Sequence, residues 1–223
     1  MEYKQPNNYH YEFSIEKPYK KTKSQESFKD AICLVTKNFD GWCSEEKAHV
    51  LIDLIFLKKP SIVVEIGVFG GRSLFPMAAA LKKNGSGIIY AIDPWDVDYS
   101  ISHQEGEHLS WWGKIDHETI YKNFINNIKK LHLEKQIVVL RQPSIQAQIS
   151  EKIDMIHIDG NHSEMTSLED VKRWVPQVKS GGVVVFDDVN LNTTNKAVEW
   201  LDKNCIRFQE FEGDNIWAIW IKP

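Results

Sequence analysis

One short segment constrains the fold of this chain more than any other. Residues 63–73 read Val-Val-Glu-Ile-Gly-Val-Phe-Gly-Gly-Arg-Ser, so an apolar run with one carboxylate ends in a glycine-rich turn, and an amphipathic helical pattern follows directly. In an open parallel sheet, such a turn presents a ligand to the N-terminus of the first helix. Glycine suits this turn because a Cβ atom would keep a ligand away from the backbone. The segment therefore predicts the first strand, binding turn and helix of an α/β sheet.

The remainder of the chain continues the alternation of strands and helices. Five apolar runs with helical patterns between them lie at residues 61–66, 87–92, 136–140, 153–158 and 182–186. That alternation is typical of βαβ units, which form a parallel sheet covered on both faces. A helical pattern near 194–204 then precedes two strand patterns, 206–211 and 216–221, joined by the turn-forming residues 212–215. We therefore expect a Rossmann-like α/β fold: a mostly parallel sheet of seven strands with an antiparallel C-terminal hairpin and helices on both faces.

The N-terminal part of the chain is less regular. Residues 1–26 are polar and follow neither a helical nor a strand period, so we expect a tail or an arm there, and a single domain over residues 27–223. Within this domain we expect a helix over 28–39 and another that begins near Ser44 and ends before Pro60.

One connection is unusually long. Residues 94–116 follow the second strand and contain Trp95, Trp111 and Trp112 together with histidines and acidic residues. Connections of this length in a compact domain are usually functional. We expect this segment to form a lid-like insertion over a binding site.

Composition excludes several classes of protein. The 223 residues carry a net charge of −4, so a nucleic-acid partner is not expected. The three cysteines are far apart, which disfavours a disulfide framework or a zinc site and favours a reducing compartment. The longest apolar stretch, residues 50–57, is too short to span a bilayer, and the N-terminus lacks the apolar region of a signal peptide. We expect a cytoplasmic protein with a small-molecule partner and no membrane partner; a homo-oligomer remains open.

Polar residues at the carboxyl ends of the first three strands are candidates for binding a cofactor, because ligands of open α/β sheets bind there. Glu65 and Gly67 close the first strand, and Asp93 closes the second. The carboxylate of Asp93 could accept both hydroxyls of a ribose, although a turn or helix cap is the alternative role. Ser144 follows the third strand. Trp95 could pack on an adenine, or it could be a core or lid residue.

Three carboxylates follow the fourth and fifth strands. Asp159 ends one strand, and the pair Asp187 and Asp188 ends its neighbour. Like charges at adjacent strand ends repel unless a cation neutralises them, and oxygen ligands suit Mg²⁺ or another divalent ion. Alternatively, Asp187 or Asp188 caps the next turn while Asp159 faces the cofactor. The pattern favours a metal site.

Two histidines lie on either side of Asp159. His162 follows it by three residues on a turn that enters a helix, so its imidazole could reach the same site as a general base for a hydroxyl group. His157 lies within the strand between two isoleucines, which favours a buried, hydrogen-bonded role.

These motifs resemble a known family. The turn E-x-G-x-x-G-G at residues 65–71 is similar to that of class I S-adenosylmethionine methyltransferases. The strings Ile-His-Ile-Asp-Gly-Asn-His-Ser at 156–163 and Gly-Gly-Val-Val-Val-Phe-Asp-Asp at 181–188 resemble metal-dependent small-molecule O-methyltransferases. The nearest group is the macrocin O-methyltransferase type, which acts on sugar hydroxyls of natural products; catechol O-methyltransferase is a more distant relative.

The resemblance implies S-adenosylmethionine as the cofactor and Mg²⁺ at Asp159, Asp187 and Asp188. It also implies that His162 and Asp159 are the catalytic residues. The implied cofactor-binding residues are Glu65, Gly67, Gly70, Gly71, Ser73, Asp93, Trp95, Ser144 and Asp159.

We therefore expect transfer of a methyl group to a hydroxyl of a small molecule, either a sugar or a vicinal diol or phenol. Two alternatives remain open: an enzyme of the same fold with a non-methylating reaction, and a non-catalytic subunit that binds the cofactor. A nicotinamide dehydrogenase is disfavoured because Phe69 breaks the G-x-G-x-x-G pattern. Methylation of nucleic-acid bases is disfavoured because the fourth strand lacks a D/N-P-P-Y/F motif.

Overall fold

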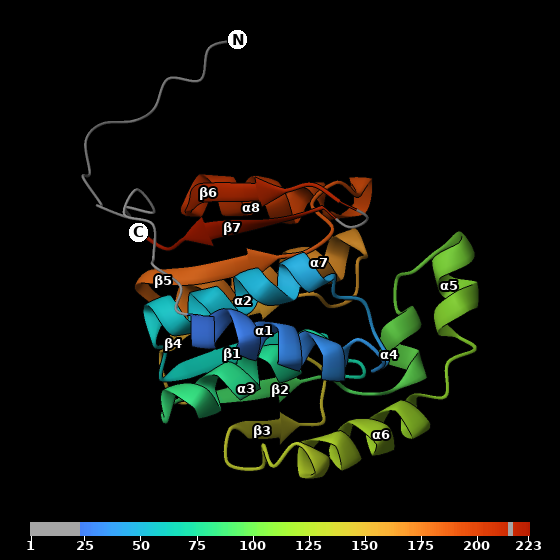
Figure 1. Ribbon diagram of the computed structural model, residues 1–223. Coiled ribbons are helices and arrows are strands. Elements are labelled where there is room, and N and C mark those ends of the chain that lie inside the picture. The colour runs from blue at the N-terminus through green and yellow to red at the C-terminus, as the bar shows by residue number, and fades with distance from the viewer. Residues whose placement is uncertain (1–22, 214–215) are drawn as a thin grey trace.

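A seven-stranded sheet forms the centre of the computed structural model, which describes residues 23–213 and 216–223 (Figure 1). The strands are β1 Ile62–Ile66, β2 Ile88–Ile92, β3 Ile137–Leu140, β4 Ile153–Ile158, β5 Val178–Phe186, β6 Ile206–Phe211 and β7 Trp217–Ile221. Their order across the sheet is β3-β2-β1-β4-β5-β7-β6. Strands β1 to β5 pair in parallel, whereas β7 runs antiparallel to both β5 and β6. The predicted fold class, including the antiparallel C-terminal hairpin, is confirmed.

Eight α-helices are described; helices cover both faces of the sheet, and α4 and α5 stand beyond the strand ends (Figure 1). Their bounds are α1 Lys23–Thr36, α2 Glu45–Lys58, α3 Leu74–Asn84, α4 Val97–Ile101, α5 Gly106–Trp112, α6 His117–Lys130, α7 Glu164–Trp174 and α8 Asn195–Asn204. Two short 3-10 helices, Val175–Gln177 and Asn192–Thr194, flank β5 and α8.

Two hydrophobic cores follow from the alternation of side chains along the strands. Val63 of β1 belongs to the core under α1, α2, α3 and α6, and its neighbour Val64 belongs to the core under α7 and α8. Both side chains are completely buried. Because parallel strands are covered on both faces, each appears in the sequence as an almost continuous apolar run. The carboxyl ends of these strands are thereby fixed by packing on both sides.

Helix α2 has the boundaries that its sequence predicts. The hydroxyl of Ser44 accepts a hydrogen bond from the backbone N–H of Lys47 (3.1 Å), which caps the first turn. The helix ends at Lys58, with Lys59 in a left-handed conformation just before Pro60. Its buried face belongs to the same core as Val63, so the cap also fixes where the first-turn side chains point.

Two predicted boundaries differ from the structure. Helix α1 spans 23–36 rather than 28–39, and β5 begins at Val178 rather than at 182 because the polar residues 179–181 continue the strand. Residues 1–22, most of the predicted tail or arm, lie outside the described residues, as do 214–215 in the hairpin turn.

The insertion 94–116 is helical rather than irregular. Helices α4 and α5 stand beyond the strand ends, at the right edge of Figure 1. The side-chain amide of Asn161 ties this segment to the turn after β4 by donating to the carbonyl oxygens of Tyr99, Ser100 and Ser102 at 3.0–3.2 Å. The insertion is therefore anchored beside Asp159 and His162.

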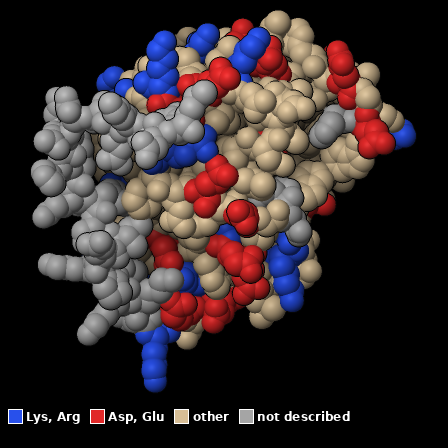
Figure 2. All heavy atoms as spheres, turned by 90° about the horizontal axis from the view of Figure 1, so that it is seen from above, with Lys and Arg blue, Asp and Glu red and all other residues tan. Residues whose placement is uncertain are grey.

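On the face that carries β6 and α8, basic and acidic side chains are interspersed (Figure 2). Arg207 of β6, for example, pairs with Asp202 at 2.8 Å and with Glu210 at 2.5 Å. Among the described residues, no helix combines the length and the apolar character needed to cross a bilayer.

Candidate functional site

A cavity of about 280 Å³ lies where β1, β2, β3 and β4 end. Its wall includes the residues that directly follow these strands, part of the 94–116 insertion, and residues of the loop before α2 and of α7. The predicted site residues in this wall are Gly67, Ser73, Asp93, Ser144, Asp159 and His162. The other predicted site residues lie behind the wall: Glu65, Gly70, Gly71, Trp95, Asp187 and Asp188. Half of the predicted set thus faces the cavity directly.

The glycine-rich turn needs glycine for packing within the protein. Gly67 has φ +81°, and a Cβ atom there would lie 1.9 Å from the carbonyl oxygen of Asp159. At Gly70 a Cβ atom would lie 2.4 Å from the carbonyl oxygen of Asp40. These clashes are with backbone atoms, which cannot move aside as a flexible side chain would. The reason that the sequence suggested, close approach of a ligand, therefore differs from the reason that the structure gives at these positions.

Glu65 is fully buried and acts on its neighbours rather than on the cavity. Its Oε1 accepts a hydrogen bond from the hydroxyl of Ser73 at 2.5 Å and lies 2.8 Å from Nδ1 of His157. Ser73 reaches the cavity wall, but its hydroxyl donates inward to Glu65. Glu65 therefore fixes the start of α3 against β4.

Asp93 joins the end of β2 to the glycine-rich turn. Its Oδ2 accepts from the backbone N–H groups of Val68 (3.0 Å) and Phe69 (2.9 Å), and its Oδ1 accepts from that of Trp95 (2.7 Å). Burial raises the pKa of Asp93, and the three hydrogen bonds oppose this rise. A carboxylate has about four acceptor positions, so one remains for a ligand hydroxyl.

Trp95 lies in the core, which was one of its predicted roles. Its indole is 2 % exposed and stacks on Phe124, with ring centroids 5.1 Å apart. Its Nε1 donates to the carbonyl oxygen of Phe69 at 2.7 Å. The side chain therefore supports the turn from behind and does not form a face for an adenine ring.

Ser144 lines the cavity and donates a short hydrogen bond from its hydroxyl to Oδ1 of Asp170. Burial raises the pKa of Asp170 to about 7, although the bond from Ser144 opposes this effect. Asp170 belongs to α7 and also lines the cavity. Asp170 was not predicted, because in the sequence it occupies an ordinary polar position of a helix.

In the part of the cavity wall that follows β4, one histidine lies between two carboxylates. Nε2 of His162 lies 3.0 Å from Oδ2 of Asp188 and 3.7 Å from Oδ1 of Asp159. Burial lowers the pKa of His162, but Asp159 and Asp188 outweigh it, so the pKa is raised overall. Burial, together with the charge of Asp187, raises the pKa of Asp159 to about 7. This group can hold and release a proton next to the cavity.

Asp187 faces the protein interior, where two cationic side chains meet it. Its Oδ2 forms a very short contact with Nζ of Lys47 and lies 3.3 Å from Nε2 of His157. Burial alone would raise the pKa of Asp187, but Lys47 and His157 outweigh it and lower the pKa. Burial and Lys47 lower the pKa of His157, whereas Asp187 and Glu65 raise it to a net value of about 9. The result is a buried chain of alternating charges.

The predicted magnesium site does not fit this arrangement. The three predicted ligands are divided between two groups, one with His157, Asp159 and Asp187 and one with Asp159, His162 and Asp188. The ammonium of Lys47 contacts Asp187 and lies 3.8 Å from Oδ2 of Asp159, between two of the carboxylates. Mg²⁺ prefers an octahedron of oxygen ligands, and here the ammonium already pairs with oxygens of two of the three predicted ligands.

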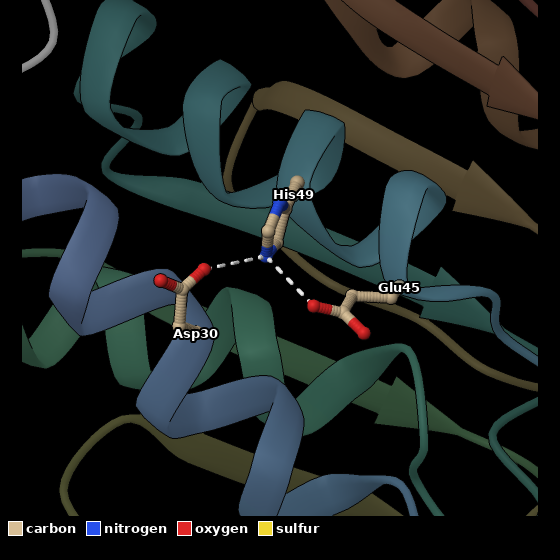
Figure 3. A group of neighbouring side chains, drawn as sticks. All are labelled: Asp30, Glu45 and His49. Atoms are coloured by element: carbon tan, nitrogen blue, oxygen red, sulfur yellow. Dashed lines mark ion pairs between the residues drawn. The ribbon is translucent and has the colours of Figure 1, made fainter.

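A further group of one histidine and two carboxylates lies outside the cavity, where α1 meets α2 (Figure 3). Nε2 of His49 lies 3.7 Å from Oδ1 of Asp30 and 3.9 Å from Oε1 of Glu45. Both acidic side chains are largely exposed to solvent. Their contacts therefore join two helices at the surface.

The outer wall of the cavity is aromatic. Trp42, Phe69 and Trp112 line it, and the ring of Phe69 lies 5.6 Å from each of the two indoles between centroids. Trp112 comes from the predicted insertion, whereas Trp42 comes from the loop between α1 and α2 and was not predicted. The cavity is thus lined by carboxylates at the strand ends and by aromatic rings on its outer wall.

The chain is similar to known methyltransferases in sequence and in fold. The family model described as "Methyltransferase domain" matches residues 64–189. The chain is 22 % identical over 157 residues to an uncharacterized protein of Sinorhizobium fredii, covering 69 % of this chain but only 16 % of that protein's length. It is 24 % identical over 159 residues to a probable cobalt-precorrin-6B C(15)-methyltransferase (decarboxylating) of Saccharolobus solfataricus, covering 71 % of this chain and 68 % of that protein.

Solved structures with the same fold include several O-methyltransferases. One is TomG of Streptomyces achromogenes in complex with SAM, with 16 % identity, coverage of 92 % of each chain and a TM-score of 0.61. At this identity the likeness shows the fold alone. Because the family model matches more than half of the chain, and its span contains the glycine-rich turn, Asp93 and the residues that follow β4 and β5, this chain belongs to the methyltransferase-domain family.

Proposed function

We propose that this methyltransferase moves a methyl group from S-adenosylmethionine to a hydroxyl oxygen of a small molecule. One observation carries the proposal: the glycine-rich turn with Asp93 and the group of Asp159 and His162 line the same cavity. A cofactor held by the first set would therefore present its methyl group toward the second. The solved O-methyltransferases with the same fold support both the cofactor and the acceptor atom.

The cofactor would lie along the ends of β1 to β3. Gly67 and Asp93 would contact its ribose and amino-acid portion, with one free acceptor position of Asp93 directed to a ribose hydroxyl. Ser144 and Asp170 also line the cavity and offer a hydroxyl and a carboxyl group for the polar edge of an adenine. Glu65, Gly70, Gly71, Ser73 and Trp95 would act indirectly, since they hold the turn in place.

The chemistry requires a base and an accurate alignment. S-adenosylmethionine supplies an electrophilic methyl carbon on a sulfonium. The acceptor oxygen forms the new bond to carbon as the carbon–sulfur bond breaks, and S-adenosylhomocysteine leaves. His162 would take the hydroxyl proton, and Asp188 at 3.0 Å would stabilise the resulting imidazolium. Most of the rate enhancement would come from alignment of the reacting atoms. Magnesium, which the sequence predicts, has no step in this proposal.

The acceptor would bind against the aromatic wall. Trp42, Phe69 and Trp112 suit a molecule with a flat or apolar face next to its hydroxyl group, such as a sugar ring or a phenol. The insertion 94–116 would exclude water from this end of the cavity. Its anchor through Asn161 supports this role, because it ties α4 to the turn that carries His162.

Calorimetric titration with S-adenosylhomocysteine tests the cofactor assignment. We expect wild-type binding in the micromolar range, about −8 kcal/mol. Asp93→Ala should lose most of this binding. Glu199→Gln, an exposed change on α8, should bind as the wild type does. Equal binding by Asp93→Ala, or none by the wild type, would contradict the proposal.

A screen of sugars, catechols and other diols with methyl-labelled S-adenosylmethionine then tests the acceptor class. Label transferred to a hydroxyl, and lost in His162→Gln, supports O-methylation. Cofactor binding without transfer to any acceptor would favour a non-catalytic subunit. Consumption of the cofactor with a different product would favour a non-methylating enzyme.

A further inference from the structure

A buried lysine lies where the sequence predicts a metal ion. The Lys47 side chain is 5 % exposed, contacts Oδ2 of Asp187 and lies 3.8 Å from Oδ2 of Asp159. Lysine is rarely buried unless it is paired. Of the two nearby carboxylates, Asp159 lines the cavity and Asp187 lies behind it at the end of the neighbouring strand. The ammonium therefore lies at the base of the candidate active site.

The local fold places this ammonium where it is. Ser44 caps α2, so Lys47 lies in the first turn, and it shares the buried face of the helix with Leu51 and Ile55. Its Nζ also lies 5.8 Å from the ring centroid of Trp217 on β7. A cation in the first turn is disfavoured by the helix dipole. The contact with Asp187 compensates for this position, so the two residues form a matched pair.

The charges around Lys47 are already close to balance. Four carboxylates meet here, those of Glu65, Asp159, Asp187 and Asp188. Three groups that can carry positive charge face them: Lys47, His157 and His162. A divalent ion among the same oxygens would bring two more positive charges close to the ammonium, and like charges repel strongly in a buried site.

We propose that the Lys47 ammonium takes the place of a divalent cation at this end of the sheet and holds the Asp159 carboxylate in position for the acceptor, so that the chain needs no bound metal. Lys47 acts through Asp159 and Asp187 and is therefore a positioning residue. The inference rests on the proposed function for the acceptor. Whether the Lys47 ammonium replaces a metal ion can nevertheless be measured without any acceptor.

Titration with Mn²⁺ after removal of metals with EDTA tests this proposal. The wild type should bind no Mn²⁺ at this site up to millimolar concentrations. Lys47→Met removes the ammonium and leaves Asp187 and Asp159 with only His157 and His162 as partners that can carry positive charge. The Oδ1 of Asp187 is already buried without a hydrogen-bond partner among the described residues and could serve as a ligand. We therefore expect Lys47→Met to bind Mn²⁺ about 10- to 100-fold more tightly than the wild type.

Two matched variants separate this effect from a structural one. Lys47→Arg keeps the positive charge and should remain without Mn²⁺ binding. Lys172→Met removes an exposed lysine of α7 and should behave as the wild type does. In Lys47→Met alone, Mn²⁺ should also raise the melting temperature, which loss of packing would not produce.

Two results would overturn the proposal. One is wild-type Mn²⁺ binding in the micromolar range that Asp188→Asn abolishes, and this result can be obtained even if Lys47→Met does not fold. The other is a folded Lys47→Met that binds Mn²⁺ no better than the wild type. S-adenosylhomocysteine titrated into the same wild-type sample separates the two proposals, since its failure to bind would contradict the proposed function and leave the Mn²⁺ result intact.

Discussion

Two groups of one histidine and two carboxylates differ in almost everything except composition. The surface group comprises Asp30, Glu45 and His49, and the cavity group comprises Asp159, His162 and Asp188; within each, the ligand atoms lie within 4.8 Å of one another. The acidic side chains of the surface group are 66 % and 68 % exposed, whereas those of the cavity group are 22 % and 14 % exposed.

The difference shows that spacing alone does not make a functional site. Water screens the surface carboxylates, so their contacts with His49 contribute little. In the cavity group the same contacts are mostly shielded from water, and Asp187 lies behind them. The pKa of Asp159 is consequently raised to about 7 by burial and by Asp187. Burial and charged neighbours, rather than residue types, distinguish the two groups.

The largest effect should come from removal of the histidine in the cavity group. His162→Gln should lower kcat by about 10²- to 10⁴-fold, because it removes the general base. Affinity for S-adenosylhomocysteine should stay unchanged. His49→Gln makes the same change in the surface group and should leave kcat at the wild-type value. Steady-state kinetics on an acceptor found by the screen would check both variants. A fully active His162→Gln would show that neither histidine is catalytic.

Replacement of Asp187, the buried residue behind the cavity group, should have a large effect on the free energy of unfolding. Asp187→Asn leaves Lys47 and His157 without their shared carboxylate and should lower the free energy of unfolding by about 3–5 kcal/mol. Urea denaturation measures this loss. Asp30→Asn in the surface group is the matched control and should change stability by less than about 0.5 kcal/mol. Similar losses in the two variants would mean that burial does not separate the groups.

Stability should also depend on pH through His157. Its pKa is raised from 6.5 to about 9 because Asp187 and Glu65 outweigh burial and Lys47. The folded state binds this proton more tightly, so the stabilisation is complete below pH 6.5 and is lost as the pH rises toward 9. Urea denaturation between pH 6 and pH 9 should show the decline in the wild type and a weaker one in His157→Gln. An equal slope in both proteins would assign the decline to other groups.

The smallest effect should come from the surface group itself. His49→Ala breaks both contacts drawn in Figure 3 and should change the free energy of unfolding by less than about 0.5 kcal/mol. Thermal denaturation in low and high salt would detect any larger contribution. A loss above about 1 kcal/mol at low salt would show that this group is better shielded than its exposure indicates.

The fold could be predicted because its strands are buried on both faces. Runs such as residues 153–158 are apolar throughout, and the structure has β4 over the same span. The start of β5 was missed because Lys179, Ser180 and Gly181 look like a loop. The helical form of the 94–116 insertion was missed too, since its two short helices carry no clear period.

The candidate site was predictable only in part. Residues at the strand ends could be placed together, because parallel strands end at one edge of the sheet. Lys47 could not, since its partner Asp187 is 140 positions away and only the tertiary fold joins them. One signal was present: a lysine four residues before Leu51 interrupts the apolar face of α2. A lysine on a buried helix face needs an acidic partner. The acidic residues at the strand ends are the candidates for that partner.

A crystal structure of the chain grown with S-adenosylhomocysteine and Mn²⁺ would test the central claim most directly. We predict that the ligand occupies the cavity with its ribose on Asp93 and its sulfur toward His162, and that no manganese lies among Asp159, Asp187 and Asp188. An empty cavity would contradict the proposed function. A manganese ion bound by these carboxylates would contradict the role assigned to Lys47.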